Sequence, residues 1–174
     1  MLVQEKIITL DSALFRRVDA LYAGAFPWHE QRETPAKIRA LSHPDYALEA
    51  WSDGEIFVGL SGSWTFDGYV YIEHLAIDGA LRSRGYGRAV LERILARSPL
   101  TVLEIDPLTS EIARRRLRFY ESMGFHANPW PHTHPAYHQG MDAHRLIVLS
   151  YPQPIDAGCY RRFSEDLRRQ VMGE

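Results

Sequence analysis

The sequence predicts an α/β protein with a twisted, mixed and mostly antiparallel central sheet of about six to seven strands flanked by helices. Residues 46–77 form three runs rich in β-branched and aromatic residues, separated by Asp53-Gly54 and Gly68. Such runs predict three consecutive antiparallel strands joined by tight turns. Downstream, the pattern alternates between strand and helix and ends in a clear strand over residues 144–151. This order is typical of a sheet that is only partly parallel.

The N-terminal part is predicted to add one strand and two helices to this sheet. Residues 3–10 resemble a strand, and Asp11 or Ser12 is a suitable cap for the helix that follows. A second helix is expected over residues 35–41, because Pro35 is tolerated in a first helical turn. The apolar positions of the first helix fall on one face: Leu14, Val18 and Leu21.

The second half of the chain is predicted to alternate between helices and strands. In chain order we expect a helix over 85–97, a strand over 101–105, a helix over 110–123 and a short strand from 125 to 127. Residues 129–142 contain three prolines and are expected to form a loop.

The C-terminal residues 152–174 are predicted to form a helical extension of a domain that covers residues 1–151. An apolar stripe at helical spacing indicates a helix that packs on the domain or on a second subunit, so a homodimer is one arrangement that the tail allows. The stripe consists of Tyr160, Phe163, Leu167 and Val171.

Composition limits the class of protein. The 174 residues suffice for one domain, and a net charge of -2 excludes a general affinity for nucleic acid or for an acidic membrane. The lone Cys159 excludes an internal disulfide and is typical of a reducing cytoplasm. The first ten residues lack a basic start followed by a long apolar run, so we expect a cytoplasmic protein without a signal peptide or membrane span.

A glycine-containing turn is the most informative feature. The segment LAIDGALRSRGYGR, residues 75–88, places Gly85 and Gly87 between a predicted strand and a predicted helix. The first N–H groups of a helix are unpaired and its dipole is positive there, which suits an anionic phosphate. The segment matches neither the dinucleotide-binding pattern nor the Walker loop. A purely structural turn is the alternative when this segment is considered alone.

Two segments together resemble the GNAT superfamily of acetyl-CoA-dependent N-acyltransferases. Arg82, Gly85 and Gly87 fill the family pattern of Arg or Gln, two residues, Gly, one residue, Gly or Ala. The segment ARRRLRFYESMGF, residues 113–125, is similar to the family helix that ends in Phe-Tyr and is followed by Gly-Phe. The resemblance implies the GNAT fold, acetyl-CoA as the cosubstrate, and direct transfer of acetyl to a primary amine of a small molecule or peptide. A CoA-binding sensor without turnover is the alternative.

The resemblance also implies which residues hold acetyl-CoA. The backbone amides that would bind the pyrophosphate belong to Ser83, Arg84, Gly85, Tyr86, Gly87 and Arg88, with Arg82 beside them. The pantetheine arm would lie along Leu75, Ala76 and Ile77. Where the family often has an asparagine, this chain has Glu104, Ile105 and Asp106, so one usual contact to the arm is unassigned.

Two residues are candidates for proton transfer. An alkyl amine is unprotonated in only about one molecule in a thousand at neutral pH, so a base is needed, and the resemblance favours Glu73 or a water chain. Strict strand alternation allows only one of Glu73 and His74 to face the substrate. The leaving thiolate needs an acid, and the resemblance favours Tyr120. The alternative for Tyr120 is a core aromatic on the apolar stripe that begins at Ile112.

The acceptor site is expected between two aromatic-rich loops. The predicted contacts are Trp28, Glu30, Trp130, Tyr137 and His138. Carboxylates at Glu30, Glu73 and Asp142 favour a cationic amine. A metal site at His132, His134 and His138 is the alternative reading of the histidine-rich loop, but no cysteine accompanies these residues and no regular element fixes their spacing, so we expect no metal.

Overall fold

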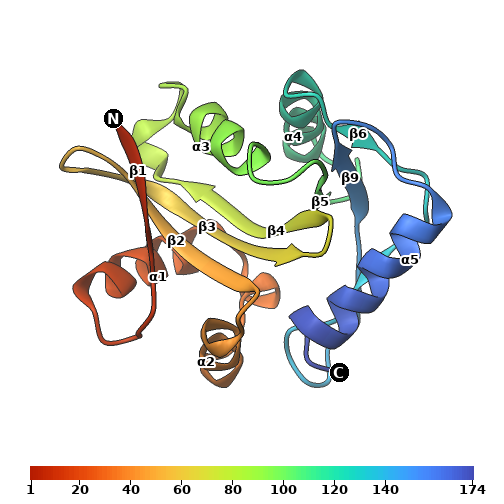
Figure 1. Cartoon of the computed structure of the whole chain (residues 1–174), viewed down its shortest axis with the longest axis horizontal. Coiled ribbons are helices and arrows are strands. Elements are labelled where there is room, and N and C mark those ends of the chain that lie inside the picture. The colour runs from red at the N-terminus through yellow and green to blue at the C-terminus, as the bar shows by residue number, and fades with distance from the viewer.

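The computed structural model describes the whole chain, residues 1–174, as a seven-stranded sheet with helices on both faces (Figure 1). The strands follow the order β1-β2-β3-β4-β5-β9-β6 across the sheet. Their bounds are β1 Leu2–Lys6, β2 Tyr46–Asp53, β3 Ile56–Phe66, β4 Tyr69–Ile77, β5 Thr101–Ile105, β6 His126–Ala127 and β9 Ile147–Tyr151. Every neighbouring pair is antiparallel except β4 and β5, which confirms the predicted mixed, mostly antiparallel sheet.

Five α-helices and three short helical turns connect the strands. Their bounds are α1 Ala13–Ala25, α2 Thr34–Ser42, α3 Tyr86–Leu95, α4 Glu111–Ser122 and α5 Ala157–Asp166, with η1 Trp28–Glu30, η2 Gly79–Leu81 and η3 Leu167–Val171. The side chain of Ser12 accepts a hydrogen bond from the Phe15 amide and so caps α1, as the sequence predicts. None of the helices is both long enough and apolar enough to cross a lipid bilayer.

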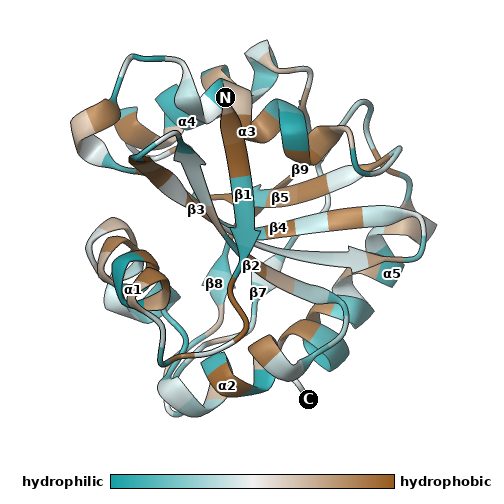
Figure 2. Ribbon diagram, turned by 60° about the vertical axis from the view of Figure 1, so that its left-hand side comes forward, coloured by the Kyte–Doolittle hydropathy of each residue, from teal (hydrophilic) through white to brown (hydrophobic).

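Apolar side chains fill the space between the sheet and the helices on each face. On one face, Val90 and Ile94 of α3 belong to the same buried cluster as Val70 of β4. On the opposite face, Phe163 of α5 packs on Tyr71, and α1 and α2 cover the remainder (Figure 1). Figure 2 shows the corresponding hydrophobic stretches along β4, β5 and β9. The central strands are therefore buried on both faces.

The segment after α4 differs from the prediction. The strand expected over residues 144–151 is interrupted at Leu146, which gives β8 (His144–Arg145) and β9. The Leu146 amide donates to the carbonyl of His132, and β8 pairs with β7 (Thr133–His134) in a second sheet (Figure 2). The region expected to be a loop, residues 129–142, thus contains the short strand β7. A strand of two residues is too short to show a periodic sequence pattern.

The C-terminal segment packs on the domain of the same chain. Phe163, Leu167 and Val171 are each at most 1% exposed and belong to the cluster under β4. This is one of the two arrangements expected for the tail, while a boundary between residues 151 and 152 stays a prediction.

A β-bulge in β4 decides which side chains reach the site. Ile72 pairs with Ser63 and His74 pairs with Gly62, so Glu73 has no partner across the strand pair. Such an extra residue breaks the two-residue alternation of a strand. The prediction that only one of Glu73 and His74 can face the site is therefore wrong, because both line the same cavity.

β4 and β5 separate soon after they meet. They pair only at Val70 with Thr101 and at Tyr71 with Val102, and β5 then continues beside β9. The edge of β4 that faces β5 is consequently unpaired over residues 73–77. This separation opens the sheet at its centre.

Candidate active site

A cavity of approximately 420 Å³ lies where β4 and β5 separate. Four parts of the chain line it: the second half of β4, the end of β5, the segment from α1 to η1, and the β7–β8 segment. Tyr120 of α4 completes the lining. The cavity therefore lies beside the unpaired edge of β4.

The turn before α3 presents backbone N–H groups in the way predicted for a phosphate site. Gly85 caps α3 with φ 80° and ψ 6°, and Ser83 has φ 65°. None of the amides of residues 83–88 donates to a backbone carbonyl. A Cβ built on Gly85 would meet no atom within 4 Å, so the space in front of these amides is open. Consecutive free amides at a helix start form a nest for an anion.

The side chains next to the free amides of residues 83–88 either bond to neighbouring elements or are exposed to solvent. The hydroxyl of Tyr86 donates to Asp53 Oδ2 at 2.8 Å and ties the turn to β2. Arg88 donates to Ser122 Oγ at 3.2 Å, which links α3 to α4. Arg82 and Arg84 are exposed, and Arg82 also lines the cavity.

Residues 75–77 and Tyr120 line the same cavity. Burial raises the pKa of the Tyr120 hydroxyl, Arg116 lowers it to a lesser extent, and no side-chain hydrogen bond contributes. The Tyr120 ring packs edge-on against Phe119 and Phe125. Ile112, expected on the apolar stripe of this helix, is 64% exposed instead. Tyr120 thus packs partly in the core and still borders the cavity.

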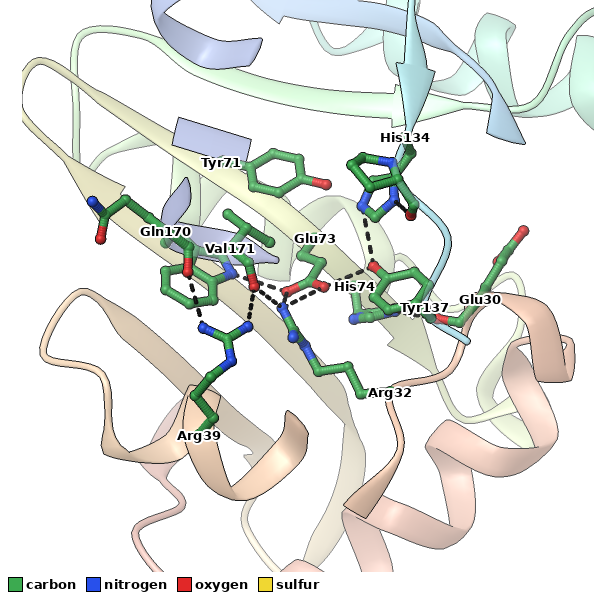
Figure 3. Close-up of polar contacts among 12 residues, drawn as sticks. Glu30, Arg32, Arg39, Tyr71, Glu73, His74, His134, Tyr137, Gln170 and Val171 are labelled. Carbon is green, nitrogen blue, oxygen red and sulfur yellow. Dashed lines mark hydrogen bonds and ion pairs between the residues drawn. The ribbon is translucent and has the colours of Figure 1, made fainter. Parts of the chain in front are cut away.

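Glu73 is held as a fixed anion. Its side chain is 0% exposed and forms an ion pair with Arg32 at 2.8 Å. The carboxylate also accepts hydrogen bonds from Trp64 Nε1 at 2.9 Å and from the Tyr137 hydroxyl at 2.7 Å (Figure 3). Burial alone raises the pKa of Glu73, but Arg32, His74 and the Trp64 hydrogen bond lower it to about 2. Both oxygens are therefore occupied, which is not the environment expected for the predicted base.

Arg32 joins this anion to the C-terminal segment. It is 6% exposed and donates to the Val171 carbonyl at 3.0 Å as well as to Glu73. Arg39 donates to the carbonyls of Gln170 and Val171 at 3.2 and 2.5 Å (Figure 3). Two guanidinium groups thus bind the last helical carbonyls, where a helix dipole is negative. These hydrogen bonds attach the C-terminal segment to the residues that hold Glu73.

A second buried carboxylate, Glu104 of β5, is also occupied. It accepts hydrogen bonds from the Tyr71 hydroxyl and, at 2.5 Å, from His132 Nε2. The other nitrogen of His132 contacts the Tyr160 hydroxyl at 2.8 Å. Burial raises the pKa of Glu104, but His134 and His132 outweigh it, so the net shift is downward.

Glu30 is a carboxylate of the cavity that forms no ion pair with an arginine or lysine. It lies in η1 and its side chain is 29% exposed, with His29 Nε2 at 3.8 Å. Burial and the negative charge of Asp106 raise its pKa. Glu30 therefore gives this wall of the cavity an acidic group, as predicted for an acceptor contact.

The other predicted acceptor contacts are divided between two places. Tyr137 lines the cavity with Glu30. Trp28 stacks on His138 with the ring centroids 3.6 Å apart, and this pair joins η1 to the segment after β7 outside the cavity. Trp130 donates to the Ile155 carbonyl at 3.1 Å and lines a separate hollow of approximately 1230 Å³. The structure thus brings only Glu30 and Tyr137 together with β4.

The three histidines considered for a metal site point in different directions. His132 is bonded to Glu104 and Tyr160, and His138 Nε2 bonds to the Trp28 carbonyl. His134 lines the cavity, whereas His132 and His138 do not. The structure contains no group of three His, Cys, Asp or Glu side chains arranged to hold a metal ion.

Sequence reasoning missed Arg32 and His144. It considered His74 only as the alternative to Glu73, and His134 only as a metal ligand. All three histidines line the cavity, and Arg32 bonds to Glu73. No local pattern marks Arg32, because its partner Glu73 lies 41 residues away. His134 stood in the histidine-rich loop, where the clustering of histidines was the only signal.

Comparisons with known proteins agree with this fold. Residues 15–125 match the profile of the acetyltransferase (GNAT) family. A GNAT-family acetyltransferase structure from Bacteroides thetaiotaomicron is 27% identical, with a TM-score of 0.90 and 99% of each chain covered. The ribosomal-protein-S18-alanine N-acetyltransferase of Escherichia coli is 18% identical, with a TM-score of 0.61, covering 90% of this chain and 97% of that one.

A third solved structure is similar in fold. Arabidopsis thaliana Naa50, in complex with the bisubstrate analogue CoA-Ac-MVNAL, is 16% identical, with a TM-score of 0.60 and coverage of 86% of this chain and 97% of that one. A comparison with curated proteins finds no match. The family profile and these structures confirm the fold and the resemblance inferred from the turn at Gly85 and the helix end at Tyr120.

Proposed function

Since the chain belongs to the GNAT family of acetyltransferases, we propose that it transfers the acetyl group of acetyl-CoA to the primary amine of a cationic acceptor. One observation carries the proposal: the unpaired edge of β4, the Tyr120 ring and the acidic Glu30 border the same cavity. A thioester carbonyl, a proton donor and an ammonium group can therefore meet there. Acetyl-CoA is the cosubstrate.

The residues around the turn fit the donor. The free amides of residues 83–88 would bind the pyrophosphate, with the exposed Arg82 and Arg84 adding positive charge. The unpaired backbone groups of residues 75–77 would pair with the amide groups of the pantetheine arm as an added strand does. These two contacts explain why the donor site needs a turn and a strand edge rather than particular side chains.

Two groups would act on the thioester itself. A backbone N–H of residues 75–77 would donate to the carbonyl oxygen, whose negative charge grows as the amine attacks. The Tyr120 hydroxyl would donate its proton to the sulfur as the carbon–sulfur bond breaks, because a phenol with a raised pKa remains protonated at neutral pH. The carbon–nitrogen bond forms in the same complex, without an acetylated enzyme.

The acceptor would be held by charge on one side and by fixed polar groups on the other. The carboxylate of Glu30 would attract the ammonium group. We infer that Glu73 acts as a positioning residue: it fixes Arg32 and Tyr137 and so shapes the wall opposite η1. The volume of the cavity, approximately 420 Å³, suits a small amine or the end of a peptide.

An acceptor screen tests the proposal. Purified protein is incubated with acetyl-CoA and, in turn, butylamine, putrescine, spermidine, tyramine and a short peptide with a free N-terminus. Thiol release and product mass are measured, and at least one amine is expected to gain one acetyl group. Tight binding of CoA without turnover of any amine would support a sensor instead. The variant Glu30→Gln should raise KM for a cationic acceptor and leave CoA binding unchanged.

A further inference from the structure

His134 is an imidazole of the cavity to which the proposed transfer assigns no task. It is 3% exposed and lies in β7. Its Nδ1 lies 2.7 Å from the Pro135 carbonyl oxygen. A carbonyl oxygen only accepts, so Nδ1 must carry the proton, and in the neutral ring Nε2 presents an unprotonated lone pair.

Tyr137 leaves that lone pair available. Its hydroxyl oxygen lies 3.3 Å from His134 Nε2 and 2.7 Å from Glu73 Oε2. The hydroxyl has one proton, and the charged carboxylate at the shorter distance is the stronger acceptor. Tyr137 therefore donates to Glu73 and keeps an oxygen lone pair that can accept a hydrogen bond from a protonated Nε2. Figure 3 shows this Glu73–Tyr137–His134 series.

We propose that His134 is the general base of the reaction, with Nε2 taking a proton from the acceptor ammonium, and that Tyr137 positions the imidazole. The inference rests on the proposed acetyl transfer. The base must border the acceptor, carry a free lone pair and gain a partner when protonated. His134 Nε2 has all three properties.

The proton count closes with this assignment. An ammonium group carries three protons, of which one remains on the amide product. One goes to His134 Nε2 and leaves to solvent after the product departs. The third leaves the nitrogen as the tetrahedral intermediate collapses and replaces, on the Tyr120 oxygen, the proton that Tyr120 gives to the sulfur. The products are the acetylated amine, CoA as the thiol and one proton.

The other titratable groups of the cavity are less suited to this task. Glu73 and Glu104 have their oxygens occupied, and both have lowered pKa values. His144 Nε2 is buried without any partner, so a proton taken up there would have no acceptor. His74 is enclosed by Tyr22, Phe26 and Tyr137, and burial lowers its pKa.

Titratable groups face His134 from the elements packed around it. Glu104 of β5 and Glu30 of η1 are the carboxyl groups whose pKa values respond to the His134 ring. His74 of β4 and His144 of β8 are the neighbouring imidazoles, and burial lowers the pKa of each. The Tyr137 oxygen completes the surroundings of Nε2.

The test is a pH–rate profile of His134→Gln with an acceptor found in the screen. At neutral pH, kcat/KM should fall by about 10²-fold, the lower end of general-base contributions. The acidic limb set by the imidazole should be replaced by a rate that rises with pH up to the pKa of the free acceptor amine. The rate should recover with trifluoroethylamine, a far weaker base that is already unprotonated at neutral pH. The control His126→Gln, on the exposed β6, should behave like the original protein. An unchanged limb in His134→Gln, or its loss in His74→Gln instead, would overturn the assignment.

A second measurement does not depend on turnover. Nitrogen-15 NMR of the histidine rings, assigned by comparison with His134→Gln, should show His134 in the Nδ1–H form with Nε2 unprotonated. The Nε2–H form would overturn the inference even if the acetyl transfer is correct. An absence of turnover in the screen would overturn the proposed function and, with it, the task assigned to His134, whichever tautomer is observed.

Discussion

The donor half and the acceptor half of the cavity present their binding groups in opposite ways. In the donor half, the amides of residues 83–88 and the edge of β4 are unpaired backbone groups. In the acceptor half, side chains from distant segments are paired with one another: Arg32 and Tyr137 both bond to Glu73. The donor half is open before its ligand arrives, whereas most polar groups of the acceptor half are already paired, with Arg32 Nε and His144 Nε2 as buried exceptions.

Because of this difference, substitutions in the two halves should have different effects, on ligand binding in one and on folding stability in the other. A backbone nest depends on the φ and ψ angles of one short turn, so damage there should remove a ligand and leave the fold nearly intact. A buried ion pair contributes little net stability while it is whole, but removal of one partner leaves an uncompensated charge. We therefore expect single substitutions in the acceptor half to affect folding, and those in the donor half to affect binding.

The largest effect is expected for Arg32→Met. It leaves the carboxylate of Glu73 buried and unpaired, which should lower the free energy of unfolding by about 3–5 kcal/mol. The double variant Arg32→Met/Glu73→Gln removes the charge as well and should recover part of the loss. Urea unfolding followed by circular dichroism measures both values. A double variant as unstable as the single one would mean that Arg32 acts through the Val171 carbonyl instead.

The same pair gives the acceptor half a pH dependence. Because the folded pKa of Glu73 is about 2, below its ordinary value, the stabilisation is present at neutral pH. It should be lost as the pH falls from the ordinary carboxyl range toward 2. Glu73→Gln should flatten this part of the stability curve, and an equally steep curve in that variant would assign the dependence to another carboxylate.

The next effect should appear in the donor half with Gly85→Val. Valine at φ 80° is strained, and its side chain would fill the open space in front of the free amides. Acetyl-CoA should therefore bind at least about 10²-fold more weakly, which corresponds to the loss of one or two charge-assisted hydrogen bonds. Gly54→Val is the matched control, with φ 59° and equally open space in the β2–β3 turn. Calorimetry should show that only Gly85→Val loses binding. Equal losses would mean that strain alone is responsible.

A comparable loss of rate is expected where the two halves meet, with Tyr120→Phe. Removal of the proton donor should reduce kcat by about 10²-fold while acetyl-CoA binding stays unchanged. Tyr151→Phe serves as the control, because Tyr151 packs on the neighbouring Phe125 outside the cavity lining. Single-turnover measurements report the chemical step. An undiminished rate in Tyr120→Phe would show that the thiolate leaves without this proton.

The contrast between the halves also explains what the sequence could reveal. The fold and the turn at Gly85 depend on strand runs, a helix start and glycines with positive φ, all of which are local patterns. The Arg32–Glu73–Tyr137 network joins residues 41 and 64 positions apart, and no local pattern reports such a pairing. The bulge that brings Glu73 and His74 to one cavity is likewise invisible, since either residue alone fits an ordinary strand.

The smallest effect concerns the contact that holds the β7–β8 wall to η1. Nδ1 of His138 lies 3.0 Å from Glu33 Oε1 and Nε2 lies 2.8 Å from the Trp28 carbonyl, so both nitrogens face acceptors and the hydrogen bond to Glu33 raises the pKa of His138. A raised folded pKa means that this stabilisation is present below the ordinary histidine value and lost as the pH rises through the folded one. Because Glu33 is largely exposed, the contact should contribute less than about 1 kcal/mol.

Hydrogen exchange resolves a contribution of this size. Protection factors of the β7 and β8 amides, corrected for intrinsic exchange, should fall by less than about fivefold between pH 6 and pH 8, as expected for under 1 kcal/mol. Amides of β3 serve as the internal reference, and His138→Gln should abolish the change. A wall that opens equally at both pH values would mean that Tyr137 and Glu73 alone hold it. The stability of the acceptor half would then depend on its buried network, with no contribution from its surface contacts.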